Sequence, residues 1–155
     1  MKANTPKTIR FTKEAYEKLR NDLVDLEKYR EEVLVRLQEA REKGDLSENG
    51  AYTAAKFELG ETDRKLRRIK HQLRYGEVVE SKHNGVVDFG SKVTLEREGK
   101  QMMFTLVSGY ESDPKEQKLS ETSPIGRAVK GKKKGDEVVV EAPAGEVVYR
   151  VVGVE

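Results

Sequence analysis

The chain has 155 residues, of which 37% are charged and 35% are apolar, and its formal net charge is +2. This length accommodates one domain or two small ones. The near-neutral total charge does not indicate a class of partner, so local charge has to be considered. The absence of cysteine excludes disulfides and thiolate metal sites, and it fits a reducing compartment.

The N-terminal stretch "MKANTPKTIRFT" has no apolar run of the kind found in signal peptides. No other stretch approaches the length of a transmembrane helix. We therefore expect a cytoplasmic protein without a membrane partner.

A first long helix is expected between Thr12 and Lys43, a range without Gly or Pro. Thr12 is suited to cap its start. Eight positions repeat at steps of three and four, as in the seam of a coiled coil or a helical hairpin. These positions are Tyr16, Leu19, Leu23, Leu26, Arg30, Val33, Leu37 and Ala40. Seven of them are apolar or aromatic. Arg30 is the exception, and we expect the neighbouring Tyr29 to cover its place in the seam.

A second helix with the same periodicity is expected up to Gly76, with its seam at Tyr52, Ala55, Leu59, Thr62, Leu66, Ile69 and Leu73. The short connection "GDLSEN" (Gly44 to Asn49) favours antiparallel pairing of the two helices. At 1.5 Å per residue the first helix is roughly 45–50 Å long. The connection then forms the tip of a thin helical hairpin.

The second half of the chain changes to β-type alternation near Val78, with glycines between the alternating stretches. "SPIGRAVKG" predicts a short helix with Ser123 as its N-cap, Pro124 at N1 and Gly131 just past its end. "DEVVVEAPAGEVVYRVVGVE" predicts two strands joined by a turn at Pro143 to Gly145. We therefore expect an α+β protein: a helical hairpin over 1–78, a linker over 79–84 and a β-rich domain over 85–155.

The tip has two interpretations. Asp45 and Glu48 have the spacing of a capping box, with Asp45 capping the second helix and Gly44 ending the first. The same two carboxylates also suit a magnesium site, since Mg²⁺ commonly takes one or two carboxylates and completes its shell with water and phosphate oxygens. A pair of ligands is incomplete, so such a site would be shared with a partner. His71 and His83 are isolated and are expected at the surface or in the linker.

Basic residues are concentrated on the second helix. Lys56 to Arg74 contains seven basic and three acidic side chains, a local charge of +4, whereas Lys13 to Lys43 contains eight basic and nine acidic ones. A solvated helix face is the ordinary explanation, but Arg41 and Lys56 flank the tip on both arms and could approach phosphates. Few aromatic residues interleave with these bases, which argues against a platform for stacking single strands.

Two stretches together resemble the bacterial Gre transcript-cleavage factors, the GreA/GreB family: "AREKGDLSENGAYTAAK" at Ala40 to Lys56 and "SPIGRAVKGKKKGDEVVVEAPAGEVVYRVVGVE" at Ser123 to Glu155. The resemblance covers essentially the whole chain, and "AYTAAK" favours the GreA type. It implies an N-terminal antiparallel coiled-coil hairpin and a C-terminal FKBP-like, polymerase-binding domain.

The resemblance also implies a function. The hairpin would enter the secondary channel of RNA polymerase and stimulate cleavage of backtracked nascent RNA, so that elongation restarts. Asp45 and Glu48 would be the catalytic pair and would hold Mg²⁺ jointly with the polymerase, the chain binding no metal alone. Ser47, Asn49 and Tyr52 would support the tip, and Arg41 and Lys56 would contact the RNA 3′ segment. The chain would act as a monomer and would not itself be an enzyme.

One departure from the family pattern lies beside the tip. Gly50 and Ala51 precede the tip tyrosine, where the family often has Ala followed by Glu or Asp. The departure removes one acid and places a helix-weakening glycine in the first turn. Three alternatives remain: a channel-binding regulator that does not promote cleavage, a prolyl isomerase, for which few aromatics are available, and a plain coiled-coil adaptor.

Overall fold

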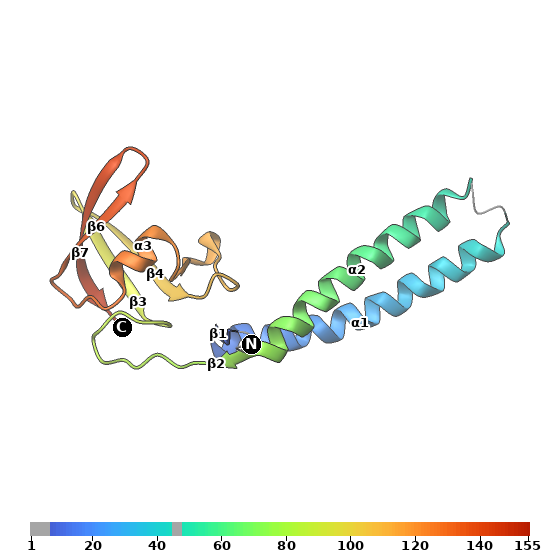
Figure 1. Ribbon diagram of the computed structural model, residues 1–155, viewed down its shortest axis with the longest axis horizontal. Coiled ribbons are helices and arrows are strands. Elements are labelled where there is room, and N and C mark those ends of the chain that lie inside the picture. The colour runs from blue at the N-terminus through green and yellow to red at the C-terminus, as the bar shows by residue number, and fades with distance from the viewer. Residues whose placement is uncertain (1–6, 45–47) are drawn as a thin grey trace, which may run out of the picture. The chain divides into compact units, whose positions relative to one another are not determined.

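The computed structural model describes residues 7–44 and 48–155, and Asp45 and Ser47 lie outside the described residues. By their contacts, the described residues form two compact units, one built around Tyr16–Gly76 and the other from Ile9–Ala15 with Glu77–Glu155. The first is a helical hairpin and the second is rich in strands (Figure 1). The expected α+β class, a hairpin followed by a β-rich half, is confirmed.

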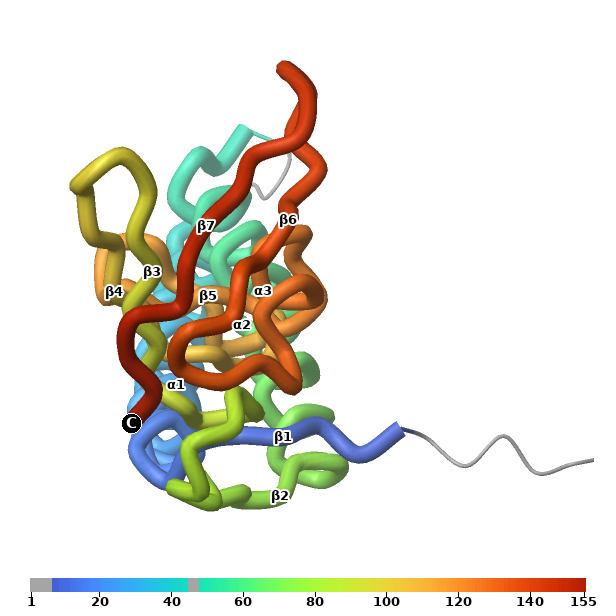
Figure 2. The backbone as a smooth tube through the Cα atoms, turned by 90° about the vertical axis from the view of Figure 1, so that its left-hand side faces the viewer, coloured from blue at the N-terminus to red at the C-terminus, as the bar shows by residue number. Residues whose placement is uncertain are grey.

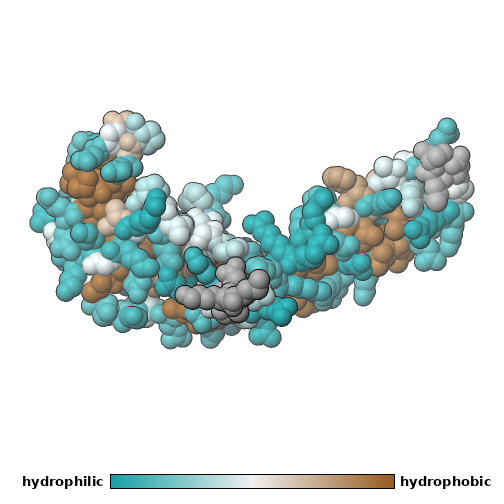
Figure 3. Space-filling view, viewed as in Figure 1, coloured by the Kyte–Doolittle hydropathy of each residue, from teal (hydrophilic) through white to brown (hydrophobic). Residues whose placement is uncertain are grey.

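The hairpin consists of α1 (Lys13–Glu42) and α2 (Gly50–Tyr75). At 1.5 Å per residue α1 is about 45 Å long. Six of the seam positions predicted from the three-and-four spacing are buried, three on each arm: Val33, Leu37, Ala40, Ala55, Thr62 and Leu66. Tyr52 and Leu59 are partly buried. Figure 3 shows the apolar side chains of the hairpin as patches among mostly hydrophilic ones. The periodic pattern therefore predicted the contact surface between the helices correctly.

Arg30 departs from that pattern, and the structure corrects the role expected of Tyr29. Tyr29 is 40% exposed and does not fill the seam. Arg30 itself occupies its seam position, and its Nε donates to Asp63 Oδ1 of α2 at 2.6 Å. This hydrogen bond, with the charge of Asp63, raises the pKa of Arg30. A long guanidinium side chain can lie along the seam while its charged end meets a partner, so no neighbour has to substitute for it.

Both helices begin and end near the expected residues. Thr12 Oγ1 accepts a hydrogen bond from the Ala15 amide at 3.3 Å, which agrees with its expected capping role. Gly44 follows the end of α1 with φ of +118°, a conformation open to glycine. Gly76 is the C-cap of α2.

A short N-terminal strand, β1 (Ile9–Phe11), pairs with β2 (Gly76–Val78) (Figure 2). Phe11 is buried and its ring lies 6.3 Å from that of Tyr110. Arg10 forms an ion pair with Glu121. These contacts group Ile9–Ala15 with the second unit.

The second unit contains one five-stranded sheet with the order β5-β4-β3-β7-β6. Its strands are β3 (Lys92–Arg97), β4 (Lys100–Val107), β5 (Lys118–Ser120), β6 (Glu137–Ala142) and β7 (Gly145–Val154). Neighbouring strands of this sheet are antiparallel except β4 and β5, which are parallel. The 3-10 turn η1 (Pro114–Glu116) precedes β5. The core is apolar, and its fully buried members include Val93, Leu95, Leu106, Val129 and Val151.

The short helix α3 (Pro124–Val129) covers part of this core. Ser123 caps it by accepting from the Gly126 amide at 3.0 Å, and Pro124 follows at the first position, as expected. A Cβ atom at Gly126 would lie 2.1 Å from the Ser120 carbonyl oxygen, so the close approach of α3 to β5 requires glycine there.

Candidate functional site

In the described part of the tip, Glu48 and Asn49 directly precede α2, and Asn49 contacts Ala40 in the last turn of α1. Glu48 is exposed, and Asn49 is half-buried. Because Asp45 and Ser47 lie outside the described residues, the pairing of Asp45 with Glu48 stays a prediction.

Asn49 is the N-cap of α2, which corrects the expected capping box. Its side-chain oxygen accepts from the Tyr52 amide at 3.1 Å, so the N-cap is Asn49 and Glu48 precedes the helix. Asp and Asn cap helices about equally well. Which residue becomes the N-cap of α2 therefore depends on which side chain lies beside the unpaired amides of the first turn. The consequence concerns Glu48, since a residue before the N-cap is not at the N3 position from which a capping box bonds back.

Asn49 also joins the two arms. Its side-chain amide donates to the Ala40 carbonyl of α1 at 2.7 Å, and Ala40 is only 3% exposed. Its own carbonyl accepts from Thr53 Oγ1 at 3.2 Å and from the Thr53 amide at 3.1 Å. We call the hydrogen bond between Asn49 and Ala40 the tip brace. It fixes the backbone immediately after Glu48 relative to the last turn of α1.

Tyr52 and the two predicted basic residues lie close behind the cap. The guanidinium of Arg41 lies 5.8 Å from the centre of the Tyr52 ring, within the range of a cation–π contact. Lys56 is exposed and lies one helical turn after Tyr52. The structure thus brings Arg41 and Tyr52 together and presents Lys56 to solvent on the same arm as Tyr52.

Ion pairs between the arms hold the hairpin farther from the tip. Arg36 of α1 contacts Glu58 of α2 at 2.7 Å, and Lys70 contacts Glu27 at 3.3 Å. Their side chains are 37–58% exposed, and ion pairs this exposed contribute little to stability. They do favour the observed pairing of the arms.

Sequence analysis missed Phe57, which is 68% exposed on α2. It lies inside the basic range Lys56 to Arg74 but outside the three-and-four seam, so the seam pattern gives it no role. His71 and His83 are both exposed, as expected.

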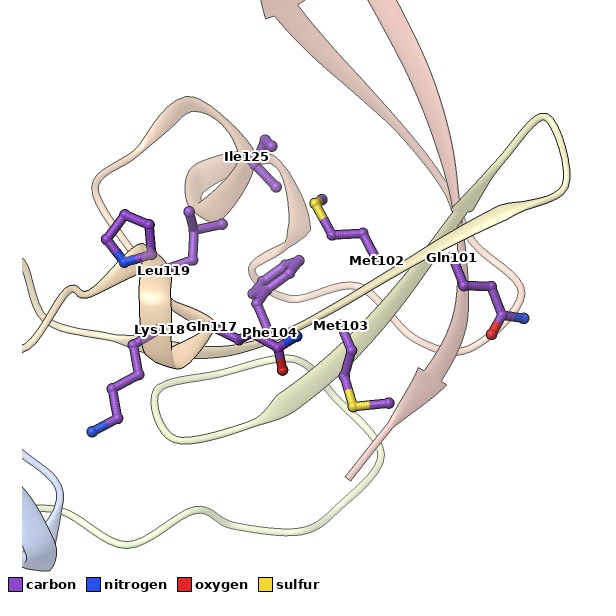
Figure 4. A pocket seen from close by; sticks show the side chains of 9 residues that line it. Gln101, Met102, Met103, Phe104, Gln117, Lys118, Leu119 and Ile125 are labelled. Atoms are coloured by element: carbon purple, nitrogen blue, oxygen red, sulfur yellow. The ribbon is translucent and has the colours of Figure 1, made fainter.

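The second unit has an apolar pocket of about 370 Å³ beside α3. Figure 4 shows Met102 and Phe104 of β4 and Ile125 of α3 directed toward the same space. Met102 is 37% exposed, whereas Phe104 is buried. Phe104 is the single aromatic residue that lines this pocket, which argues against the aromatic-lined site of a prolyl isomerase.

Within residues 7–44 and 48–155, no three His, Asp or Glu side chains come together as a metal site. In the same part of the chain, no helix is long and apolar enough to cross a membrane. Any metal at the tip would therefore need ligands beyond those that the described residues supply.

Comparisons with known proteins agree with these features. Residues 9–78 match the family model "Transcription elongation factor, N-terminal", and residues 82–155 match "Transcription elongation factor, GreA/GreB, C-term". The chain is 41% identical over 152 residues to "Transcription elongation factor GreA" of Thermotoga sp. (strain RQ2), covering 96% of this chain and 97% of the relative. It is 40% identical over 151 residues to the protein of the same name from Maridesulfovibrio salexigens, covering 95% and 94%.

Among solved structures, the "GreA factor homolog 1" protein of Thermus thermophilus is 27% identical, with a TM-score of 0.47, over 96% of this chain and 99% of that one. The two family models together span nearly the whole chain, and the curated relatives are of the GreA type. The chain therefore belongs to the GreA/GreB family of transcription elongation factors.

Proposed function

We propose that this protein stimulates Mg²⁺-dependent cleavage of backtracked nascent RNA by RNA polymerase and thereby rescues arrested complexes. The observation that carries the proposal is the placement of Glu48. Its carboxylate is exposed at the end of the hairpin, and the cap of α2 is supplied by Asn49. The family membership supports the same function.

The tip is suited to complete a metal site in a partner. Carboxylate oxygens are ligands that Mg²⁺ prefers, and this ion commonly keeps open positions for water and phosphate. Asp45 and Glu48 would hold the ion jointly with the polymerase, and the chain would bind none alone. When bound there, Mg²⁺ lowers the pKa of a coordinated water and stabilises the charge that develops during phosphodiester hydrolysis.

The residues of this chain would position the Glu48 carboxylate and the RNA, and they would not catalyse cleavage on their own. The tip brace between Asn49 and Ala40 holds the backbone beside Glu48, which limits the directions in which that carboxylate can point. Small displacements of a positioned group reduce rates strongly. Arg41, held against the Tyr52 ring, and the exposed Lys56 would engage the phosphates of the RNA 3′ segment.

Both units of the protein would bind the polymerase. The hairpin would enter the secondary channel, and the apolar pocket lined by Met102, Phe104 and Ile125 would contribute to docking on the polymerase surface. Exposed apolar groups beside a pocket are common at protein interfaces. The protein would act in the cytoplasm as a monomer and would activate the polymerase in trans.

A second function is favoured by one observation. The first turn of α2 carries no acidic residue, and it begins with Gly50. A weakened or less acidic tip would suit a factor that occupies the channel without promoting cleavage. Such a regulator would compete with cleavage factors for the same entrance.

One experiment separates the two functions. Bacterial elongation complexes carrying 5′-labelled RNA are backtracked and incubated with Mg²⁺, with and without the protein. Cleavage stimulation predicts that the protein accelerates loss of the RNA 3′ segment. If the protein binds these complexes without accelerating that loss, the regulator is correct and the cleavage proposal is refuted.

A further inference from the structure

Phe57 has the largest exposed fraction, 68%, among the large apolar side chains that the structure describes. Ala55 and Thr62, which face α1, are only 5% and 3% exposed. At 100° per residue, Phe57 lies on the opposite side of α2 from this seam. A single exposed apolar residue is ordinary, so its surroundings have to decide whether it has a role.

Gly60, three residues after Phe57, gives the second observation. Glycine weakens a helix interior relative to alanine, and Gly60 lies well inside α2 (Gly50–Tyr75). A Cβ atom at this position would meet nothing within 4 Å. Packing among the described residues therefore does not require glycine here, and the position leaves open space on the surface of α2.

Three of the four surface neighbours of Phe57 on the helix are small, and the fourth is Glu61, which pairs with Arg64. Residues three and four apart on a helix are adjacent on its surface. Thr53 and Ala54 lie one turn before Phe57 and Gly60 lies one turn after it, and all three are exposed. The small side chains at these three positions leave space beside Phe57 for a flat group.

Basic side chains are in excess around this face, because the acidic neighbours Glu58 and Glu61 are each paired with an arginine. Lys56 is adjacent in sequence and exposed, and Arg64 and Arg68 follow on the same side of the helix at seven and eleven residues from Phe57. Arg64 pairs with Glu61, whereas Lys56 and Arg68 form no ion pair with any residue in the described part of the chain. An open aromatic ring among cations suits a single-stranded nucleic acid, because bases stack on the ring and phosphates meet the cations. A protein partner would favour a larger continuous apolar patch.

We propose that this Phe57 face (Thr53, Lys56, Phe57, Gly60 and Arg64) binds single-stranded RNA by stacking an unpaired base on Phe57, with Gly60 leaving room for the base. The inference rests on the proposed function, in which the RNA is the extruded 3′ segment. Phe57 follows the N-cap by eight residues, about 12 Å along the helix axis. At about 3.4 Å per stacked nucleotide, a segment must extend roughly three or four nucleotides past the tip to reach it.

The test compares elongation complexes backtracked by two nucleotides with complexes backtracked by eight. For the longer segment, Phe57→Ala should raise the protein concentration needed for half-maximal cleavage about 5- to 150-fold, which is the contribution of one stacked base. For the shorter segment it should change nothing. Phe57→Trp retains a stacking surface and should restore the wild-type value. Val35→Ala, at a 57% exposed apolar position of α1, is the matched control and should match wild type on both.

An equal loss on both complexes would mean that Phe57 contacts the polymerase, and it would overturn the inference. No loss on the longer segment would overturn it as well. Gly60→Gln adds an independent measurement: it should raise thermal stability yet weaken cleavage of the longer segment only. Higher stability with unchanged cleavage would remove Gly60 from the site.

If wild-type protein accelerates no cleavage at all, the proposed function fails, and a separate readout decides the stacking. Single-stranded RNA containing 2-aminopurine loses fluorescence when its base stacks. Wild-type protein and the Phe57→Trp variant should quench this fluorescence, and Phe57→Ala should not. Equal quenching by wild type and Phe57→Ala would refute stacking on Phe57.

Discussion

Substitutions at Asn49 can separate its two structural roles. The side-chain oxygen caps α2 through the Tyr52 amide at 3.1 Å, and the side-chain nitrogen forms the tip brace to the Ala40 carbonyl at 2.7 Å. Asn49→Ser keeps a good capping oxygen, but a serine side chain is too short to form the brace. Asn49→Ala removes both interactions.

The expected magnitudes follow from the two hydrogen bonds. Loss of an N-cap costs about 0.5–2 kcal/mol, and loss of one hydrogen bond costs about 0.5–1.5 kcal/mol. The Ala40 carbonyl also accepts from the Lys43 amide at 3.3 Å, so it is not left unpaired and the lower range applies to the brace. We therefore expect Asn49→Ser to destabilise the hairpin by about 0.5–1.5 kcal/mol and Asn49→Ala by about 1–3.5 kcal/mol.

Amide hydrogen exchange at Tyr52 measures the cap directly. Asn49→Ala should lower its protection about 2- to 30-fold, which corresponds to the free energy of the cap, and Asn49→Ser should leave it nearly unchanged. In the cleavage assay, both variants should be slower than wild type, since both lose the brace. Full cleavage activity of Asn49→Ser would refute the argument that the brace positions Glu48. Unchanged Tyr52 protection in Asn49→Ala would refute the cap.

Three further predictions concern other parts of the molecule. Arg30→Leu alone should lower the midpoint of thermal unfolding only slightly, because an exposed ion pair contributes little. Arg30→Leu with Asp63→Leu should leave the midpoint unchanged or raise it, because the seam position becomes apolar, and a strongly destabilised double variant would contradict this. Ile125→Ser should weaken binding to core polymerase in a pull-down or titration while the isolated protein stays folded by circular dichroism, and unchanged binding would remove the pocket from the interface. Ala51→Glu restores an acid in the first turn of α2, where it should add about 0.3–1 kcal/mol through the helix dipole and accelerate cleavage; slower cleavage would mean that the missing acid is not a deficit.

The hairpin was predictable because its signals are local and repeated. Two stripes at helical spacing, a run without Gly or Pro, and terminal residues such as Thr12 and Gly76 all indicate the same structure. Ser123 and Pro124 likewise mark the start of α3 within a few residues. In each case neighbouring residues along the chain contain the information.

The features that sequence analysis missed depend on contacts between distant residues or on position outside a pattern. Asp45, Ser47 and Asn49 are all good capping residues, so the sequence alone does not select among them, whereas the structure shows Asn49 as the cap and bonded to Ala40 across the hairpin. β1 pairs with β2 more than sixty residues later. A strand of only three residues has too little alternation for the sequence to predict this pairing. Phe57 was missed because seam counting discards residues on the outer face.

The role of Glu48 provides the most direct test of the proposed function. Glu48→Gln keeps the size of the side chain and removes its charge, and it leaves the Asn49 cap in place. With backtracked complexes saturated by protein, we predict that Glu48→Gln lowers the rate of RNA cleavage at least about 10-fold, a loss typical of a disturbed metal site. We also predict that it competes with wild type for the complexes as well as before. A cleavage rate equal to that of wild type would contradict the account.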